Sequence, residues 1–143
     1  MIRPLRPDSK GFIRWLAGAD IKKGQICVLT GGECVPAAEG VNSAVILGVA
    51  VEDCNDTETA ILYSPRQQFE AEFYQGGSTD VATADLLGTD FDIYVDGAAG
   101  DGSGEGEMYL DLNDTTGPML NLLGYDNVRR VGIFEFIESL LYT

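Results

Sequence analysis

The side chains best suited to chemistry in this chain are three cysteines and a large number of carboxylates. The 143 residues include no histidine, so a serine or cysteine hydrolase would lack the usual base beside its nucleophile. The 23 acidic residues produce many carboxylate pairs by chance, and such a pair is therefore weak evidence for acid–base catalysis. We accordingly expect a protein that is not an enzyme.

Cys27, Cys34 and Cys54 have neither the spacing of a disulfide framework nor that of a CxxC metal site. Their odd number indicates free thiols in a reducing compartment. Cys27 and Cys34 flank a predicted two-residue turn at Gly31–Gly32. That turn would place Cys34 opposite Leu29, so the two thiols would lie diagonally across the hairpin, an arrangement that suits a disulfide poorly.

Oxygen ligands for a hard cation gather in the glycine-rich segment 96–107. The stretch 101–106 follows the first half of an EF-hand loop, but the twelfth position is Leu112, where a bidentate glutamate is required. A solvated hairpin tip is the interpretation we favour, and we expect no metal site and no cofactor. Loose calcium binding is the alternative, and its ligands would be Asp96, Asp101, Glu105 and Glu107.

Charge is divided unevenly along the chain. Residues 1–23 carry six of the nine basic side chains against two acids, whereas residues 24–128 carry Arg66 against nineteen acids. The net charge of −14 argues against nucleic-acid binding, which needs Lys and Arg to neutralise phosphates. A basic leader on an acidic body predicts an arm that docks onto a partner; a solvated charge bias without a partner is the alternative.

Short runs of β-branched and aromatic residues between glycines predict about nine strands and no alternating βα order. We predict an all-β fold, a small β-barrel or β-sandwich with one short helix over 78–87 and an extended N-terminal arm. The arm covers residues 1–11 and the β-rich domain covers residues 12–143, with a subdomain seam near Pro65. No apolar run approaches 18 residues, so we expect no membrane partner.

Several stretches together resemble the capsid decoration, or cement, proteins of tailed bacteriophages. In the first half these are WLAGADIKKGQICVL (15–29), AVILGVAVED (44–53) and TETAILY (57–63). In the second half they are FEAEFY (69–74), DLLGTDFDIY (85–94), DLNDT (111–115), LLGY (122–125) and VRRVGIFEF (128–136). The resemblance extends as a pattern over most of residues 15–137.

The resemblance implies a structural virion protein that binds the outer surface of an assembled capsid and stabilises the shell. The partners would be the major capsid protein and two further copies of the chain, forming a homotrimer at threefold or quasi-threefold positions. The protein would reside on the virion surface after assembly in the host cytoplasm. The alternatives are another phage structural module, such as a tail, baseplate or head-fibre base, and a small ligand-binding β-barrel.

The basic leader lies outside this pattern, and its role follows from physical argument. An extended arm can add a strand to the sheet edge of a neighbouring protein and gain backbone hydrogen bonds without a large folded interface. Its prolines limit the freedom of the unbound chain. We predict that the capsid contact comprises Arg3, Arg6, Lys10, Arg14 and Trp15.

Overall fold

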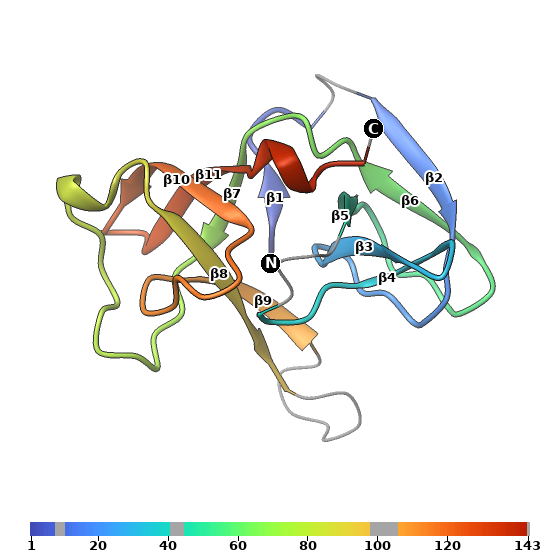
Figure 1. The fold of residues 1–143 in the computed structure, drawn as a ribbon, viewed down its shortest axis with the longest axis horizontal. Coiled ribbons are helices and arrows are strands. Elements are labelled where there is room, and N and C mark those ends of the chain that lie inside the picture. The colour runs from blue at the N-terminus through green and yellow to red at the C-terminus, as the bar shows by residue number, and fades with distance from the viewer. Residues whose placement is uncertain (8–10, 41–44, 98–105, 143) are drawn as a thin grey trace.

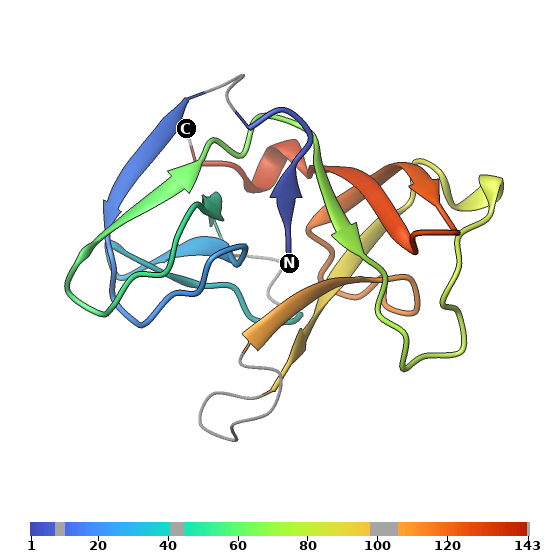
Figure 2. The ribbon, with the colours of Figure 1, turned by 180° about the vertical axis from the view of Figure 1, so that it is seen from behind.

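The computed structural model describes residues 1–7, 11–40, 45–97 and 106–142. This part of the chain forms eleven strands in two curled sheets that lie side by side (Figures 1 and 2). The predicted all-β class is therefore confirmed, in a form that combines half-barrel curvature with sandwich-like packing.

The five-stranded sheet is built from the first half of the chain, in the order β2-β6-β5-β3-β4. It curls because the end of β2 returns to β4, where Ala17 bridges Cys34 and the Gly18 amide donates to the Cys34 carbonyl at 2.9 Å. Its strands are β2 (Phe12–Leu16), β3 (Ile26–Thr30), β4 (Glu33–Pro36), β5 (Val45–Ala50) and β6 (Thr59–Tyr63).

The six-stranded sheet has the order β1-β7-β11-β10-β8-β9 and uses the second half of the chain together with its start. It also curls toward closure, because the Tyr74 amide beyond β7 donates to the Leu110 carbonyl on β9 at 2.9 Å. Its strands are β1 (Arg3–Pro4), β7 (Phe69–Glu72), β8 (Asp90–Asp96), β9 (Glu107–Asp111), β10 (Leu120–Asp126) and β11 (Val131–Phe136).

The main hydrophobic core lies between the two sheets. Ile26 and Ile46 reach it from the five-stranded sheet, whereas Phe69, Phe91 and Phe134 reach it from the six-stranded sheet. A second cluster fills the curl of the five-stranded sheet. Strands β3 and β5 therefore contribute to both cores, which explains why β5 reads as an almost continuous apolar run and not as an alternating one.

Gly48 interrupts that run because another backbone passes close to it. A β-carbon at this position would lie 2.3 Å from the carbonyl oxygen of Tyr63 on β6. The pairing of β5 with β3 also shifts register here, between Cys27 and Val28. Glycine at this position therefore permits the close approach of the two backbones and the shift in register.

The N-terminal segment is extended, but it does not project from the body as an independent arm. Arg3 pairs with Glu70 and Pro4 with Phe69, so β1 is the edge strand of the six-stranded sheet. Ile2 is 1% exposed and belongs to the main core. The apolar side chains of Ile2 and Pro4 turn inward while Arg3 turns outward, and this alternation is what docks the segment onto its own sheet.

The predicted helix over 78–87 is reduced to one 3₁₀ turn, Ala84–Leu86. Two asparagine side chains form hydrogen bonds with the backbone of the residues that precede this turn. The Thr79 backbone amide donates to Asn113 Oδ1 at 2.7 Å, and the backbone of Ala82 exchanges two hydrogen bonds with the Asn127 side chain. These tertiary contacts compete with intrahelical bonds in a segment too short to form a stable helix alone. A second 3₁₀ turn, Glu138–Leu140, precedes the C-terminus.

Candidate docking face

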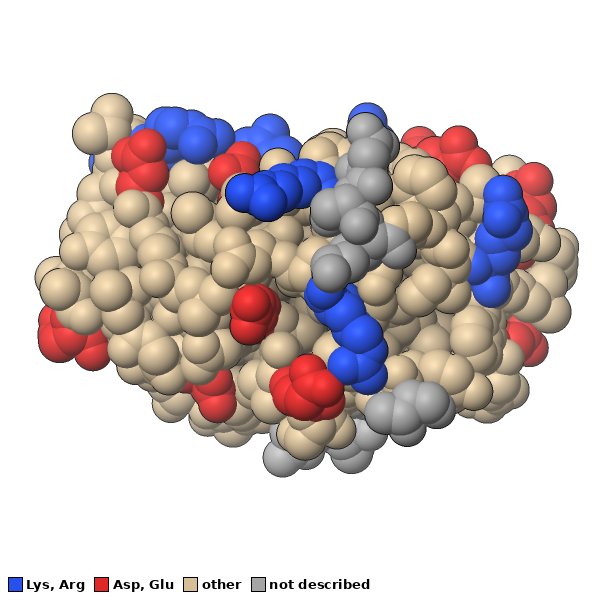
Figure 3. Space-filling model, turned by 90° about the horizontal axis from the view of Figure 1, so that it is seen from above, with Lys and Arg blue, Asp and Glu red and all other residues tan. Residues whose placement is uncertain are grey.

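Several basic side chains lie on one face of the molecule, with acidic side chains among them (Figure 3). Arg3 and Arg6 come from the start of the chain, Arg66 from the segment leading into β7, and Arg129 from the turn between β10 and β11. Arg3 and Arg129 both bind the carboxylate of Glu70, at 2.7 and 3.1 Å, and Arg66 binds Glu138 at 2.8 Å. The Leu5 amide donates to the Gln68 carbonyl and holds these segments together. We call Arg3, Arg6, Arg66 and Arg129 the basic face.

The ion pairs of the basic face leave its guanidinium groups available to a partner. The side chains of Arg3, Arg66 and Arg129 are 50%, 46% and 55% exposed. The pair between Arg66 and Glu138 joins two exposed side chains, so it contributes at most about 1 kcal/mol and a partner's carboxylate can replace it at little cost. Glu70 is only 12% exposed, so Arg3 and Arg129 can contact a partner at low cost only while one of them keeps Glu70 paired.

Of the predicted capsid contacts, Arg3 lies in the basic face and Arg6 is exposed beside it, with no ion pair to any described residue. Lys10 lies outside the described residues. Arg14 and Trp15 both belong to β2, but they point to opposite faces of the strand. Arg3 and Arg6 are therefore both exposed near the start of the chain, whereas Arg14 and Trp15 point to opposite faces of β2.

Trp15 faces the interior of the curled sheet. Its indole N–H donates to the Gly32 carbonyl at 3.0 Å, and its ring meets Tyr142 edge-on at 5.2 Å. It also packs against the second core cluster. These intramolecular contacts account for the placement of the chain's single tryptophan without any partner protein.

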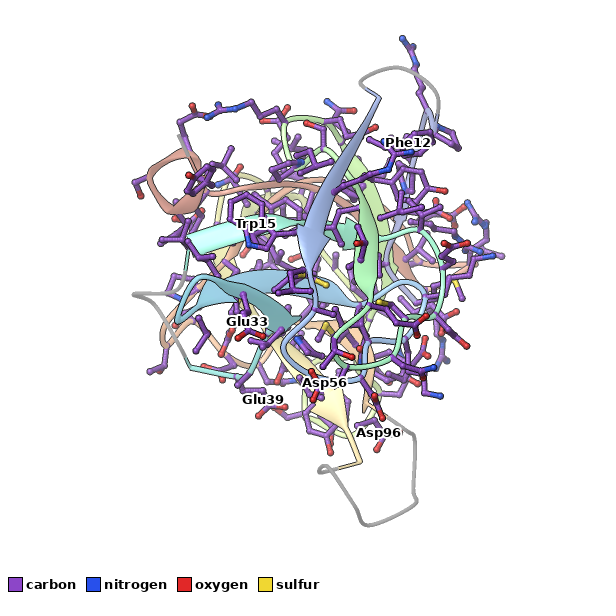
Figure 4. All side chains as sticks on the ribbon, turned by 90° about the vertical axis from the view of Figure 1, so that its right-hand side faces the viewer. Phe12, Trp15, Glu33, Glu39, Asp56 and Asp96 are labelled. Atoms are coloured by element: carbon purple, nitrogen blue, oxygen red, sulfur yellow. The ribbon has the colours of Figure 1, made fainter. Side chains whose placement is uncertain are left out.

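The outward face of β2 contains two large apolar side chains that our sequence reasoning did not single out. Phe12 and Leu16 are each 51% exposed, and Arg14 lies exposed between them. Alternation within FIRWL would have identified this face, because one face of a half-buried strand must meet solvent. Figure 4 shows β2 at the front, with the labelled carboxylates Glu33, Glu39, Asp56 and Asp96 below Phe12.

The acidic segment 96–107 lies largely outside the described residues, since 98–105 are among those not described. Asp96 ends β8 and Glu107 begins β9, and the two residues pair across these strands. Glu107 also binds the N-terminal ammonium of Met1. Among the residues that are described, no group of three or more cysteine or acidic side chains is placed to hold a metal ion.

The three cysteines converge on the second core cluster as free thiols. Cys34 lies opposite Leu29 and Cys27 lies opposite Pro36, so the predicted register of the hairpin is confirmed. A hydrogen bond from the Cys27 thiol to Cys34, together with burial, raises the pKa of Cys27 well above its ordinary value. Burial, and then the nearby Glu58, raises the pKa of Cys54. The hydrogen bond from Cys27 lowers the pKa of Cys34, and burial opposes this. The raised pKa disfavours the thiolate of Cys27 and Cys54, and burial keeps the sulfur of Cys34 away from solvent reagents.

We expect all three thiols to resist labelling by Ellman's reagent at pH 7.5 until the chain unfolds. Cys27 and Cys34 are fully buried, and Cys54 is 9% exposed. The native protein should react roughly a hundredfold more slowly than a free thiol, and three equivalents should react in urea. Rapid stoichiometric labelling of Cys27 or Cys34 in the native state would contradict this placement.

Neither protein-family models nor curated protein sequences match this chain. No helix in the described residues is long and apolar enough to cross a membrane.

Proposed function

We propose that this protein is a structural virion protein that binds the outer surface of a tailed-phage capsid and stabilises the shell. The basic face is the observation that carries the proposal. Four arginines face two paired carboxylates there, in a chain whose net charge is −14. A local excess of positive charge on an acidic body steers a single face toward an acidic partner and keeps the remaining surface self-repelling.

The proposal includes a homotrimer at threefold or quasi-threefold positions, with the major capsid protein as the other partner. A protein that binds only the assembled shell stabilises it by mass action. Three linked copies would add avidity to contacts that are individually weak. The resemblance in sequence supports this arrangement, and the exposed arginines supply the chemistry for it.

Charge reversal on the basic face should weaken shell binding. We expect the double variant Arg6→Glu/Arg66→Glu to bind purified empty shells about tenfold more weakly in co-sedimentation, because attraction becomes repulsion at two exposed positions of this face. The matched control is Lys22→Glu/Lys23→Glu, which changes net charge equally on the turn between β2 and β3. That control should bind as the wild type does.

Equal binding by both double variants would overturn the assignment of the basic face as the docking surface. Absence of wild-type binding at low salt would overturn the capsid proposal itself, since screening is weakest there. Sedimentation equilibrium of the free protein tests the trimer separately.

A further inference from the structure

Strand β2 ends the five-stranded sheet, with β6 as its only neighbour in the strand order. Its pairing with β6 is antiparallel over all five residues, from Phe12↔Tyr63 to Leu16↔Thr59. The other long side of β2 meets β4 at its Leu16 end, beside the bridge between Ala17 and Cys34, and the Trp15 indole N–H donates to the Gly32 carbonyl in the turn before β4. The backbone edge from Phe12 to Arg14 is therefore the open margin of the sheet among the described residues.

The direction of the backbone groups along this edge follows from neighbouring hydrogen bonds. The Ala17 amide donates to Glu58 at 2.8 Å, so Ala17 directs its backbone toward β6. Because successive residues of a strand alternate, Ile13 and Trp15 also face β6, and Phe12, Arg14 and Leu16 face away. The Val51 amide donates to Ile61, which shows that Ile61 of β6, opposite Arg14, directs its backbone toward β5.

The same three residues direct their side chains outward. Phe12 and Leu16 are half exposed, and Arg14 lies between them as the single charge of the strand. Next to them on β6 lie Ile61 and Tyr63, and the Phe12 and Tyr63 rings are 5.7 Å apart. Edges with unpaired backbone groups beside apolar side chains are rare in monomers, because they capture other strands.

We infer that the open edge of β2 accepts an extended segment of another protein as an added strand. The segment carries a carboxylate opposite Arg14, with apolar residues on either side of it that cover Phe12 and Leu16. Main-chain hydrogen bonds hold the strand and the alternating side chains select it. The identity of the partner rests on the proposed function, but the edge itself can be tested without a capsid.

A second copy of β2 is a poor occupant of this edge. Arg14 is the central residue of the strand, so an antiparallel pair of β2 strands related by a twofold axis would place Arg14 opposite Arg14. Like charges directly opposite each other destabilise a strand pair. The charge on this edge therefore selects a segment with an acidic centre over a copy of itself.

The test uses the full chain and three capped heptapeptides. The first reads Thr-Val-Thr-Glu-Thr-Val-Thr, the second has Lys in place of Glu, and the third repeats the first with methylated backbone amides. Binding is followed through the fluorescence of Trp15, the only tryptophan, and through the backbone amide NMR shifts of residues 12–16. We expect the Glu peptide to bind roughly five- to tenfold more tightly than the Lys peptide, and the methylated peptide not to bind.

The variant Arg14→Glu should reverse the preference between the Glu and Lys peptides, whereas Lys23→Glu should leave it unchanged. Because Arg14 is exposed, its replacement should not alter the melting temperature, and this is checked for each variant. Equal binding of the methylated peptide, no preference for charge, or no binding at all would overturn the inference. Self-association that Arg14→Glu alters would identify a second copy as the occupant and would also overturn it.

The outcome is separable from that of the proposed function. Selective peptide binding without co-sedimentation on shells would support the strand-accepting edge and contradict the capsid assignment. Co-sedimentation of the wild type without peptide selectivity would support the capsid assignment and contradict the strand-accepting edge.

Discussion

Replacing Ile2 with alanine should lower the free energy of unfolding by about 2–5 kcal/mol, the cost of a cavity left by a buried aliphatic side chain. Ile2 is 1% exposed and belongs to the core between the sheets. Its amide also donates to the Gly24 carbonyl at 3.1 Å. Urea denaturation of the purified variant measures this loss of stability as a lower midpoint urea concentration with an unchanged m-value.

Leu5→Ala is the matched control for this substitution. Leu5 belongs to the same segment but is 39% exposed, so its truncation should cost about 0.5 kcal/mol or less. A cost as small for Ile2→Ala would show that the N-terminal segment is not part of the folded body in solution.

This placement changes how an arm would be tested. Deleting residues 1–10 removes Ile2 and the pairing of β1 with β7, so a loss of capsid binding after deletion could reflect unfolding alone. Exposed charges such as Arg6 and Arg14 can be reversed without disturbing the core. For that reason the binding experiments above depend on charge reversal and not on truncation.

Asp92 on β8 should make the stability of the protein fall as pH rises from about 4 to above 6. Its side chain is fully buried, and its Oδ2 accepts a hydrogen bond from the Gly40 amide at 2.6 Å. Its Oδ1 has no hydrogen-bond partner among the described residues. Burial raises the pKa of Asp92 from 3.8 to about 6, the backbone amides of Ile93 and Gly40 oppose this, and the nearby charges of Asp114 and Glu39 add to it.

Because the folded pKa of Asp92 lies above the unfolded one, the folded state binds more protons between these two values. The stabilising contribution is full below pH 3.8 and is lost as pH rises through about 6. The shift in pKa corresponds to an upper limit of about 3 kcal/mol. Asp92→Asn removes the titration, so the stability of the variant relative to wild type should increase between pH 4.5 and pH 7.5.

Urea denaturation of both proteins at several pH values measures the difference between their free energies of unfolding. Taking the difference removes the pH dependence that the net charge of −14 causes in both proteins alike. Glu52→Gln, at an exposed carboxylate, is the control and should give a small difference that does not follow this trend. A difference between Asp92→Asn and wild type that stays constant with pH would show that Asp92 does not titrate in this range.

Local pattern was sufficient for much of the fold. Short runs of β-branched and aromatic residues between glycines predicted about nine strands, and the described residues form eleven. The register of the hairpin that contains Cys27 and Cys34 followed from a two-residue turn, since loop length sets strand pairing. Gly48 marked a close approach of two strands because no other residue leaves room for the Tyr63 carbonyl.

The helix predicted over 78–87 shows where local pattern failed. Asn113 and Asn127, each more than thirty residues away in sequence, supply the hydrogen bonds that fix the segment. Such partners are invisible to a reading of neighbouring residues. A segment of about two turns has too little intrinsic stability to resist them.

The sequence by itself determined the all-β class, the free thiols, the acidic body and the concentration of basic residues near the start, because composition and short-range alternation control these properties. Only the tertiary structure decided that the N-terminal segment joins its own sheet as an edge strand, and that Trp15 faces inward while Arg14 faces out. It also decided that Asp92 is buried with one oxygen that has no hydrogen-bond partner among the described residues. Each of these depends on which distant strand becomes the neighbour, and that choice is made by the joint burial of two sheets and not by any single segment.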